Sequence, residues 1–581
     1  MKTVFFDVET RGLNANKVFL ITFSEWSENR IRAFQDRDNF IKYLNDLNDD
    51  VILIAHNGFS FDFISIFDNY IEDKIINSDG EVLKNKSKII FVKFKLENKK
   101  TINLIDTINL LPMSLEKIGN VLNFEKLNKT INVEKFTDKN YVNENFDLIL
   151  KYCIRDTEIL KKAVKTFFPD IQDLKYYSIA GFTFKNFKNH LKEVYNLKPY
   201  HFLKVNKELN DFCRKAYFGG RVEAFKLGDF KNINYYDINS LYPYVMTFEY
   251  PDWKSYKHYT EKTHSQDILL KAIRKNDYWE NQPLFIVNAT VKIPDESFTI
   301  LPIRLKEKVV FPVGTITGTW TSAEFNAWNF NIIQIHDVYV FNKSFHLFKH
   351  FIENAYNERL KFKKQGNPLE LIKKLEMNSL YGKFGFVKHN DIIVNEKDLN
   401  ATKDGLFYKN KKIDLKGKNY GDYFFISEKE EYAYYTNFLI ASFITSYARV
   451  ELLNLINTAG KENVIYIDTD AIFTTQNLKG AGDELGGFKL EERFKNLKIH
   501  GLKLYDFEND KNEWIGKHKG IRGKKAILNN SEFDDERIVK PYTAIKRKLK
   551  AGDTVKIKIN LKREYTKGTV DSKGVVKPLK F

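Results

Sequence analysis

The chain has 581 residues, with 93 Lys and Arg against 76 Asp and Glu, and a formal net charge of +17. This length requires several domains, and a hydrophobic share of 43% is enough for globular cores, which excludes wholesale disorder. Two cysteines exclude a disulfide framework and a zinc–cysteine cluster, and the absence of an uninterrupted apolar stretch of about 18 residues argues against a membrane span.

Residues 1–165 alternate short apolar runs with periodic segments, which predicts an α/β domain. Strands are expected in TVFFDVET, VFLITFSEW and VILIAHN, and a long helix in LILKYCIRDTEILKKAVKTF. Asp7 and Glu9 are two residues apart in the first strand and therefore share one face. Tyr152 and Asp156 are four apart and share one face of the helix, while Asp62 stands between phenylalanines.

A helical stretch over about 170–215 ends in AYFGGRVEAF, where the Gly pair predicts a tight turn. From 230 onward the pattern becomes rich in strands. INYYDINSLYPYV predicts a strand that runs into a turn, with Asp237 near its end. NPLELIKKLEMNSLYGKFG predicts a helix of about four turns ending at Gly382, with Lys374, Asn378 and Tyr381 on one face.

Residues 386–425 are polar and rich in Gly and Asn, which favours a small excursion or long hairpin. ENVIYIDTDAIFTT predicts a hairpin that carries Asp468 and Asp470 side by side at its tip. The last 80 residues are rich in Lys and alternate as strands do. No internal repeat is visible.

The acids fall into two sets, and like charges this close repel unless a cation lies between them. Carboxylate oxygens suit Mg²⁺, and two such ions can stabilise both the attacking and the leaving oxygen of a phosphoryl displacement. Beside the first set, Tyr152 can orient an attacking water. Beside the second, Lys374 can meet a triphosphate, and Tyr381 can stack on a base or sugar. Tyr242 can pack under a sugar ring, where a 2′-hydroxyl would collide.

Six short motifs then carry a family resemblance. DINSLYP, KKLEMNSLYGKFG and YIDTD resemble the three polymerase motifs of family B DNA polymerases, and DVE, NGFSFD and YCIRD resemble the three motifs of their 3′→5′ exonuclease, all in order. YFGGR and KLY are similar to motifs of the protein-primed branch found in phages and linear plasmids.

The resemblance implies an α/β multidomain fold, with an RNase H-like exonuclease domain and a right-hand polymerase of palm, fingers and thumb. The expected boundaries are 1–165 for the exonuclease, 166–229 for linker helices, 230–298 and 426–510 for the palm, 299–345 for a first insertion that contacts a terminal protein, 346–385 for the fingers, 386–425 for a second insertion for strand displacement, and 511–581 for the thumb.

The resemblance also implies roles for residues. The metal ligands are expected to be Asp237 and Asp468 in the polymerase and Asp7, Glu9, Asp62 and Asp156 in the exonuclease, with Asp470 and Tyr152 as further catalytic residues. Nucleotide contacts are expected from Ser240, Leu241, Tyr242, Lys374, Asn378 and Tyr381. DNA contacts are expected from Thr10, Asn57, Phe61, Thr107, Tyr217, Gly219, Gly220, Ser379, Gly382, Tyr466, Lys503, Tyr505, Lys517 and Lys519. The lysine that the family's exonuclease uses is expected at Lys129.

The implied reaction is attack of a primer 3′-oxygen on the α-phosphate of a dNTP, with pyrophosphate leaving. The implied cofactor is Mg²⁺, with two ions in each active site and Mn²⁺ able to substitute. The implied partners are template and primer DNA, dNTPs and a terminal protein whose hydroxyl primes the first nucleotide. The protein is expected to be a monomer that acts without a membrane, inside the host cytoplasm of a phage or plasmid.

Four alternatives remain open at this point. A nucleic-acid-primed family B polymerase shares the same motifs. A reverse transcriptase or RNA polymerase also uses palm carboxylates, but reverse transcriptases have adjacent aspartates where Thr469 here separates two. An exonuclease with an inactive polymerase half would have lost acids that are present here. A structural nucleic-acid-binding protein would explain the charge but not two sets of acids.

Overall fold

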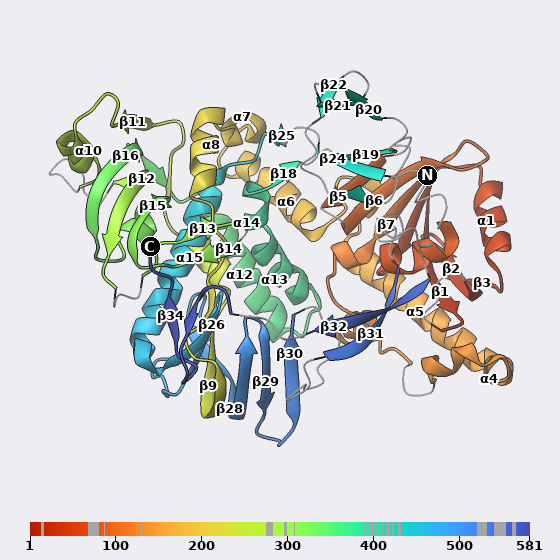
Figure 1. Ribbon diagram of the computed structural model, residues 1–581. Helices are drawn as coiled ribbons and strands as arrows, with labels where there is room; N and C mark the ends of the chain where they lie inside the picture. Colours follow the sequence, from red (N-terminus) through yellow and green to blue (C-terminus); the bar gives the residue numbers. More distant parts are fainter. Residues whose placement is uncertain are drawn as a thin grey trace.

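The computed structural model describes the chain except residues 13–16, 68–80, 86–87, 128–130, 275–282, 296–298, 307, 389–390, 396–398, 403–404, 409–410, 414–418, 421–422, 428–430, 520–531, 540–552 and 561–564. The N-terminal domain lies on one side of the molecule, and most of the rest of the chain, including a second large sheet, lies on the other (Figure 1).

The N-terminal domain is built on a seven-stranded sheet in the order β3-β2-β1-β4-β7-β6-β5. Its strands are β1 Lys2–Thr10, β2 Val18–Glu25, β3 Arg32–Phe34, β4 Val51–Ala55, β5 Glu81–Asn85, β6 Lys88–Lys95 and β7 Thr101–Asp106. The β1–β4 and β4–β7 pairs are parallel, and the other pairs are antiparallel. β4 reads VILIA and is buried along its whole length, as a parallel strand covered on both faces should be.

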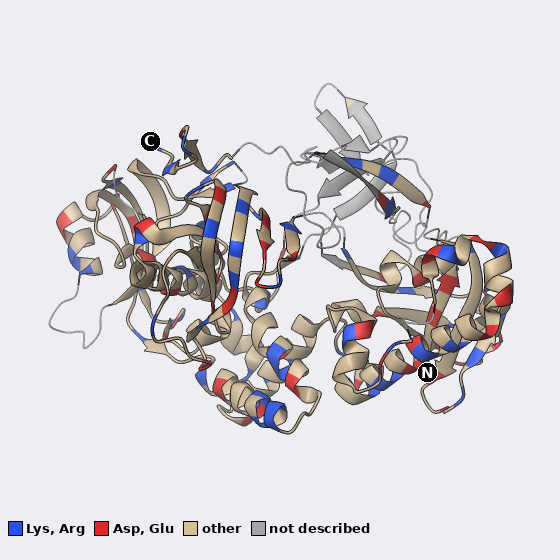
Figure 2. Ribbon diagram, turned by 90° about the horizontal axis from the view of Figure 1, so that it is seen from below, with Lys and Arg blue, Asp and Glu red and all other residues tan. Residues whose placement is uncertain are grey.

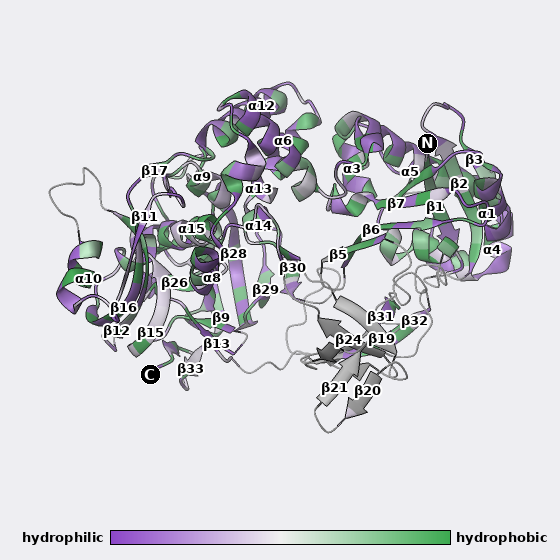
Figure 3. Ribbon diagram, turned by 90° about the horizontal axis from the view of Figure 1, so that it is seen from above, coloured by the Kyte–Doolittle hydropathy of each residue, from purple (hydrophilic) through white to green (hydrophobic). Residues whose placement is uncertain are grey.

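Helices α1 Arg37–Asp46, α3 Leu115–Val121, α4 Lys139–Glu144 and α5 Phe146–Phe167 accompany this sheet. The predicted long helix is α5, and it packs against β1 and β2 with Ile159, Leu160 and Val164 in the core. Figure 3 shows the hydrophobic colour on the strands of this domain and hydrophilic colour on the outlying α4. The packing brings Tyr152 and Asp156 to the end of β1 that carries Asp7 and Glu9.

Helices α6 Ile179–Glu193, α7 Pro199–Leu203 and α8 Lys207–Lys215 lead to a second seven-stranded sheet in the order β30-β29-β28-β9-β27-β26-β8. Its strands are β8 Val222–Ala224, β9 Gly228–Ile238, β26 Val464–Asp468, β27 Ala471–Thr474, β28 Phe488–Gly501, β29 Leu504–Glu508 and β30 Trp514–His518. All its pairs are antiparallel. Basic residues (blue) and acidic residues (red) both occur along its strands (Figure 2).

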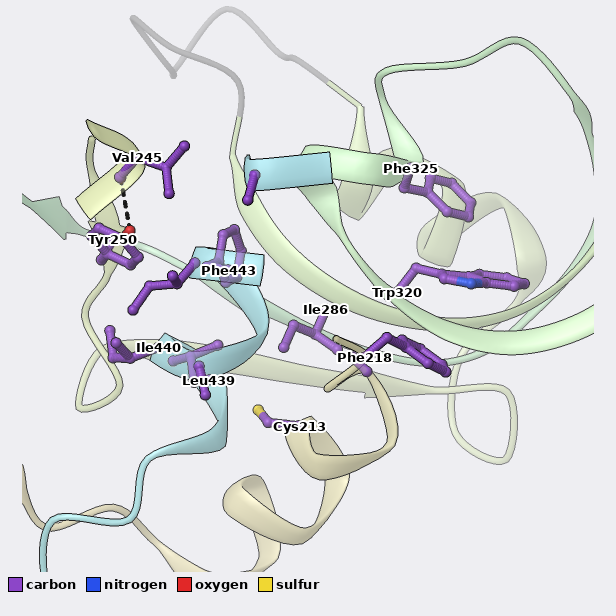
Figure 4. Close-up of a cluster of buried hydrophobic side chains, with 14 of the residues drawn as sticks. Cys213, Phe218, Val245, Tyr250, Ile286, Trp320, Phe325, Leu439, Ile440 and Phe443 are labelled. Carbon is purple, nitrogen blue, oxygen red and sulfur yellow. Dashed lines mark hydrogen bonds between the residues drawn. The ribbon is translucent and has the colours of Figure 1, made fainter. Parts of the chain in front are cut away.

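Helix α15, Phe438–Ala459, is the core helix of this half of the molecule. It is long and apolar enough to cross a membrane by length and composition, but 78% of its most apolar window is buried inside the protein. Around it pack α9 Leu241–Met246, α8 and the side chains of Trp320 and Phe325 (Figure 4). In the same cluster the hydroxyl of Tyr250 donates to the carbonyl of Val245 at 2.8 Å.

A four-stranded sheet in the order β11-β16-β12-β15 corrects one predicted boundary. Its strands are β11 Tyr256–Thr260, β12 Leu284–Ile293, β15 Gly314–Thr321 and β16 Asn331–Phe341, with α10 Gln266–Ile273 and α11 Ser322–Phe325 beside them. β12 bonds both β15 and β16, so a domain boundary at 298/299 is wrong because it would cut this sheet. The boundary at 510/511 is wrong for the same reason, because β30 pairs with β29.

The remaining elements are short strands and helices. They are β10 Tyr250–Pro251, β13 Ile303–Leu305, β14 Lys308–Val310, β17 Ser344–Phe345, α12 Lys349–Lys364, α13 Leu369–Ser379, α14 Tyr381–Phe384, β18 Val387–Lys388, β19 Asp391–Asn395, β20 Leu399–Thr402, β21 Gly405–Tyr408, β22 Lys411–Ile413, β23 Asn419–Tyr420, β24 Tyr423–Ser427, β25 Glu431–Tyr432, β31 Glu532–Ile538, β32 Thr554–Asn560, β33 Gly568–Val570 and β34 Val576–Pro578. The excursion expected at 386–425 therefore forms small antiparallel sheets.

Candidate active sites

The first acidic set converges in the N-terminal domain. Asp7 and Glu9 project from β1, and the ligand atoms of Asp7, Glu9 and Cys153 all lie within 4.8 Å of one another. Asp156 lies one turn after Cys153 on α5 and is 3% exposed, with its Oδ1 atom lacking a hydrogen-bond partner among the described residues. The predicted convergence of strand and helix acids is therefore present.

These carboxylates are poorly compensated without a cation. Burial and the charge of Asp156 raise the pKa of Asp7 to about 7, and burial raises the pKa of Asp156 to about 6. Burial and the charge of Asp7 also raise the pKa of Glu9 and of Asp62 well above the ordinary range. An oxygen-rich set with one orphaned buried oxygen fits hard divalent cations such as Mg²⁺.

Lys126 is a site residue that sequence reasoning missed. Its Nζ atom lies 2.5 Å from Asp156 Oδ2 and 4.7 Å from the centre of the Tyr152 ring. The lysine expected here, Lys129, falls in 128–130, outside the described residues. No local pattern separates the two candidates, because both stand in the polar segment FEKLNK between elements.

The DNA contacts predicted in the N-terminal domain divide into two groups. Asn57, with φ of 64°, is exposed beside this site, and Phe61 is half-buried. Thr10 and Thr107 are 3% and 1% exposed, and their hydroxyls donate to the carbonyls of Gly12 and Ala55. The hydroxyls of Thr10 and Thr107 are therefore engaged inside the protein, and their contact with DNA stays a prediction.

The C-terminal hairpin of β31 and β32 reaches this domain (Figure 1). Val539, at the end of β31, is 1% exposed and packs on the fully buried Ile64, with Phe61 and Val555 alongside. The contact lies next to Asp62, so the C-terminal segment supports the element that carries one of the acids.

The second acidic set lies at the tip of the β26–β27 hairpin. β26 ends at Asp468 and β27 begins at Ala471, with Thr469 between them at φ of 66°. Asp468 and Asp470 are therefore not neighbours on one strand face, as alternation predicted, because a turn separates them. The N–H of Ile238 donates to the carbonyl of Asp470 at 2.8 Å, which places Asp470 beside Asp237.

The two hairpin acids have different partners. Burial, then Asp470 and Glu491, raise the pKa of Asp237 to about 7, while Lys489 and Lys374 oppose the shift. Asp468 instead forms a 3.0 Å ion pair with Lys503. Of the two hairpin acids it is therefore Asp470 whose charge acts on Asp237, and the expectation that Asp237 and Asp468 are the metal ligands stays a prediction.

Glu491 is a second residue, after Lys126, that the sequence did not single out. It occupies a register shift of β28 opposite β9, between Leu490 and Glu492. A bulge re-aims the side chain of its extra residue. Glu491 forms an ion pair with Lys489 at 2.7 Å, and its charge helps to raise the pKa of Asp237.

Two aromatic rings form a wall near Asp470, whose charge helps to raise the pKa of both tyrosines after burial. Tyr242 and Tyr381 stack with centroids 4.4 Å apart and an interplanar angle of 13°. The predicted single helix is interrupted at the buried Leu380, so Tyr381 begins α14 instead of continuing α13. Its ring can then lie against Tyr242 of α9.

The other predicted nucleotide contacts lie around this wall. Lys374 and Asn378 are exposed on α13, and the Asn378 amide donates to the Lys374 carbonyl at 2.9 Å. Ser240 adopts φ of 52° at the start of α9. Leu241 is 1% exposed in the core, so its side chain is not available to a nucleotide.

The YFGGR turn is fixed by hydrogen bonds from Arg449, which is itself part of a buried ion pair. Arg449 of α15 pairs with Glu324 at 2.5 Å, with side-chain exposures of 1% and 0%. Its Nη1 atom also donates to the carbonyls of Phe218 and Gly219 at 2.9 and 2.7 Å. These contacts fix the turn against the hairpin tip.

Gly220 of this turn gives a testable prediction. A Cβ atom at Gly220 would lie 2.7 Å from Thr469 Cγ2 and 3.1 Å from the Tyr242 hydroxyl, so Gly220→Ala must displace the tip that carries Asp468 and Asp470. A displacement of about 1 Å at a reacting centre can cost about 10²-fold in rate, and we expect a loss of that order in primer extension. Gly219→Ala is the matched control, because its Cβ would meet no described atom within 4 Å. Equal rates for the two variants would contradict this account.

The predicted DNA contacts near the C-terminus come together on neighbouring strands. Tyr505 pairs with Lys517 across β29 and β30, and the N–H of Lys519 donates to the carbonyl of Lys503 at 2.8 Å. Lys503, Lys517 and Lys519 are exposed. Tyr466 is fully buried and its hydroxyl accepts from the Lys503 N–H at 2.9 Å, so it positions this turn, and its contact with DNA stays a prediction.

Three further predicted DNA contacts lie at the helical side of the site. Gly382 is exposed, Ser379 bonds Thr183 of α6 at 2.9 Å, and the ring of Tyr217 lies against Gly385. Tyr217 and Ser379 are therefore engaged in packing around the exposed Gly382.

Comparison with known proteins agrees with this geometry. The family described as DNA polymerase type B, organellar and viral, matches residues 123–462. The chain belongs to this family. As a family B chain it is 27% identical over 602 residues to a probable DNA polymerase of Neurospora intermedia, covering 91% of this chain and 58% of that one. It is 26% identical over 492 residues to the DNA-directed DNA polymerase of Enterobacteria phage PRD1, covering 81% and 75%. The chain thus spans about half the length of the fungal relatives.

Solved structures support the same fold. Phi29 DNA polymerase complexed with primer-template DNA superposes with a TM-score of 0.72 at 18% identity, covering 96% of this chain and 99% of that one. The predicted fold class, an α/β multidomain polymerase with exonuclease, palm, fingers and thumb, is confirmed. So is the resemblance to the phage-type branch of family B.

Proposed function

We propose that this protein is a DNA-directed DNA polymerase with a separate 3′→5′ exonuclease site. The main support is that Asp470 lies beside Asp237 and near the stacked Tyr242 and Tyr381 rings, with Lys374 close enough to oppose the rise in the pKa of Asp237. An acidic pair, a phosphate-seeking lysine and a stacking wall suit a deoxynucleoside triphosphate. Relatives named DNA polymerase support the assignment.

In the polymerase site, Asp237 and Asp470 would hold Mg²⁺, with Glu491 in support. When bound, the cations stabilise the attacking primer 3′-oxygen and the leaving pyrophosphate. Lys374 binds the triphosphate as a point charge, and the stacked tyrosines limit the space at the sugar 2′ position. Lys503 is one of the lysines proposed to bind the primer, and its ion pair with Asp468 connects this group to the hairpin tip.

In the exonuclease site, the cations would be held by Asp7, Glu9, Asp62 and Asp156. When bound, they activate the attacking water and stabilise the leaving oxygen. Tyr152 remains a neutral hydroxyl because burial and Asp156 raise its pKa, so it can orient an attacking water. Lys126 fixes Tyr152 and Asp156 relative to each other. The product is a nucleoside monophosphate.

Priming by a terminal protein is the finer part of the proposal. The phage PRD1 relative and the phi29-like fold support it, as do the YFGGR and KLY segments. A protein hydroxyl would then take the place of the primer 3′-oxygen, inside a host cell. The sheet of β11, β12, β15 and β16 and the strands over 386–432 are the proposed insertions for priming and strand displacement.

A primed single-stranded DNA circle tests the function. With dNTPs and Mg²⁺, products longer than one circle are expected, because the enzyme should displace the strand ahead of it. Products that stop at one circle would keep the polymerase but remove the displacement role of 386–432. Degradation without extension would contradict the polymerase proposal and favour a nuclease alone.

A pH dependence follows from the raised carboxyl pKa values. Asp237 and Asp7 have pKa values of about 7 in the folded protein against an ordinary 3.8, so the metal-free native state binds protons that the unfolded state releases. Its free energy of unfolding should therefore fall as the pH rises between these two values, from about 4 to about 7. Mg²⁺ should raise the melting temperature more at the higher pH, and Asp7→Asn with Asp237→Asn should flatten the dependence. An equal Mg²⁺ effect at both pH values would contradict it.

A further inference from the structure

Cys153 places a thiol inside the proposed exonuclease site. It is fully buried on α5, and its Sγ atom lies 3.5 Å from Asp7 Oδ2 and 3.2 Å from the Thr22 hydroxyl. Together with Asp7 and Glu9 it offers two oxygens and one sulfur whose mutual distances are all under 4.8 Å.

A buried thiol is more often a small apolar packing group. Cys213 is such a group in this chain, fully buried in the central hydrophobic cluster beside Leu439 and Phe218 (Figure 4). No described carboxylate acts on its pKa, which burial raises. Cys153 differs because three carboxylates lie close to it: burial raises the pKa of its thiol, and the charges of Asp7, Glu9 and Asp156 raise it further. Both cysteines are therefore fully buried, but Cys213 is surrounded by hydrophobic side chains and Cys153 by carboxylates.

Asp156 supplies an independent indication of a ligand. It is 3% exposed, and its Oδ1 atom has no hydrogen-bond partner among the described residues, although Oδ2 is held by Lys126. Asp156 follows Cys153 by three residues on α5, and therefore lies on the same helix face. Leaving a buried carboxylate oxygen unpaired is costly, so a cation in this space would stabilise it.

We propose that Asp7, Glu9 and Cys153 form a mixed oxygen and sulfur site for a thiophilic divalent cation, Zn²⁺ or Cd²⁺, which competes with Mg²⁺ and silences the exonuclease while DNA synthesis continues. Thiolate selects Zn²⁺ and Cd²⁺, whereas Mg²⁺ prefers oxygen alone. Three protein ligands with Asp156 or a water in the fourth position complete a tetrahedron. The thiol proton passes to solvent as the metal–sulfur bond forms.

This inference rests on the proposed exonuclease only for its consequence, because cation binding can be measured without activity. The metal-free protein is titrated with Cd²⁺, and the ultraviolet charge-transfer absorption of a cadmium–thiolate bond is recorded. One equivalent is expected to bind in the wild type and in Cys213→Ser. The absorption should be absent in Cys153→Ser and Cys153→Ala, with their fold checked by melting temperature and by DNA synthesis.

The second readout is inhibition of primer degradation by Zn²⁺ in excess Mg²⁺, each variant being scaled to its own rate without Zn²⁺. Removing a direct ligand should shift the half-inhibiting Zn²⁺ concentration by about tenfold or more, since even supporting residues cost 10–100-fold in affinity. Cys213→Ser should show no shift.

The outcomes separate the two proposals. Absence of the cadmium–thiolate absorption in the wild type, or its persistence in Cys153→Ser, would overturn the cation site. So would equal inhibition by Zn²⁺ of the wild type and Cys153→Ser. A wild type that shows the absorption but degrades no primer in Mg²⁺ would retain the cation site and remove the exonuclease.

Discussion

Asp470→Asn is expected to lower nucleotide incorporation by about 10³-fold or more, while degradation of a single-stranded primer continues at its normal rate. Asp470 lies beside Asp237, whose pKa it raises, and the backbone contact from Ile238 fixes that separation. Asparagine keeps the shape of the side chain but removes the charge that a cation needs. The loss should appear in single-turnover extension of a primed template.

Asp468→Asn is the matched control, two residues away on the same hairpin. Asp468 pairs with Lys503, so its loss should weaken primer binding and slow extension by roughly tenfold, nearer the cost of a lost charged contact. Lys503→Met should show a similar defect, and the double variant should be little worse than either single one. If Asp468→Asn proved the more damaging change, the cation site would instead be built on Asp237 and Asp468.

The local parts of both sites could be predicted from sequence. Asp7 and Glu9 share a strand face, Tyr152 and Asp156 share a face of α5, and Asp237 ends its strand, because each of these relations depends only on the period of one element. The position of the hairpin tip was also correct. The turn inside it was not, because a positive φ at Thr469 cannot be read from alternating apolar residues.

Relations between distant segments could not be predicted. Glu491 faces Asp237 because of a register shift, Lys126 faces Asp156 because a loop crosses α5, and Arg449 meets Glu324 across 125 residues. None of the three has a spacing that marks it. The boundary error at 298/299 has the same origin, because strand pairing within the β12 sheet joins segments that composition separates.

Asp7→Asn is expected to lower 3′→5′ degradation by about 10³-fold or more and to leave extension within about twofold of the wild type. Asp7 is half-buried beside Glu9, Asp62 and Asp156, and the pKa values of all four acids are raised, so the set depends on a cation for compensation. Degradation of a labelled single strand and extension of a primed template, measured on one preparation, give both rates.

Lys126→Met tests whether the surrounding residues matter as well as the ligands. Lys126 holds Asp156 and Tyr152 together, and its removal leaves Asp156 with a second unpaired oxygen next to three other acids. We expect degradation to fall by about 10²-fold, and Mg²⁺ to be needed at higher concentration because the acids repel more strongly. Lys117→Met, on the exposed side of α3, is the control for loss of a positive charge. The two acidic sets lie in different sheets and share no described ligand, so we expect them to act independently. A loss of DNA synthesis in Asp7→Asn or Lys126→Met equal to the loss of degradation would contradict this and show that the two sets work as one site.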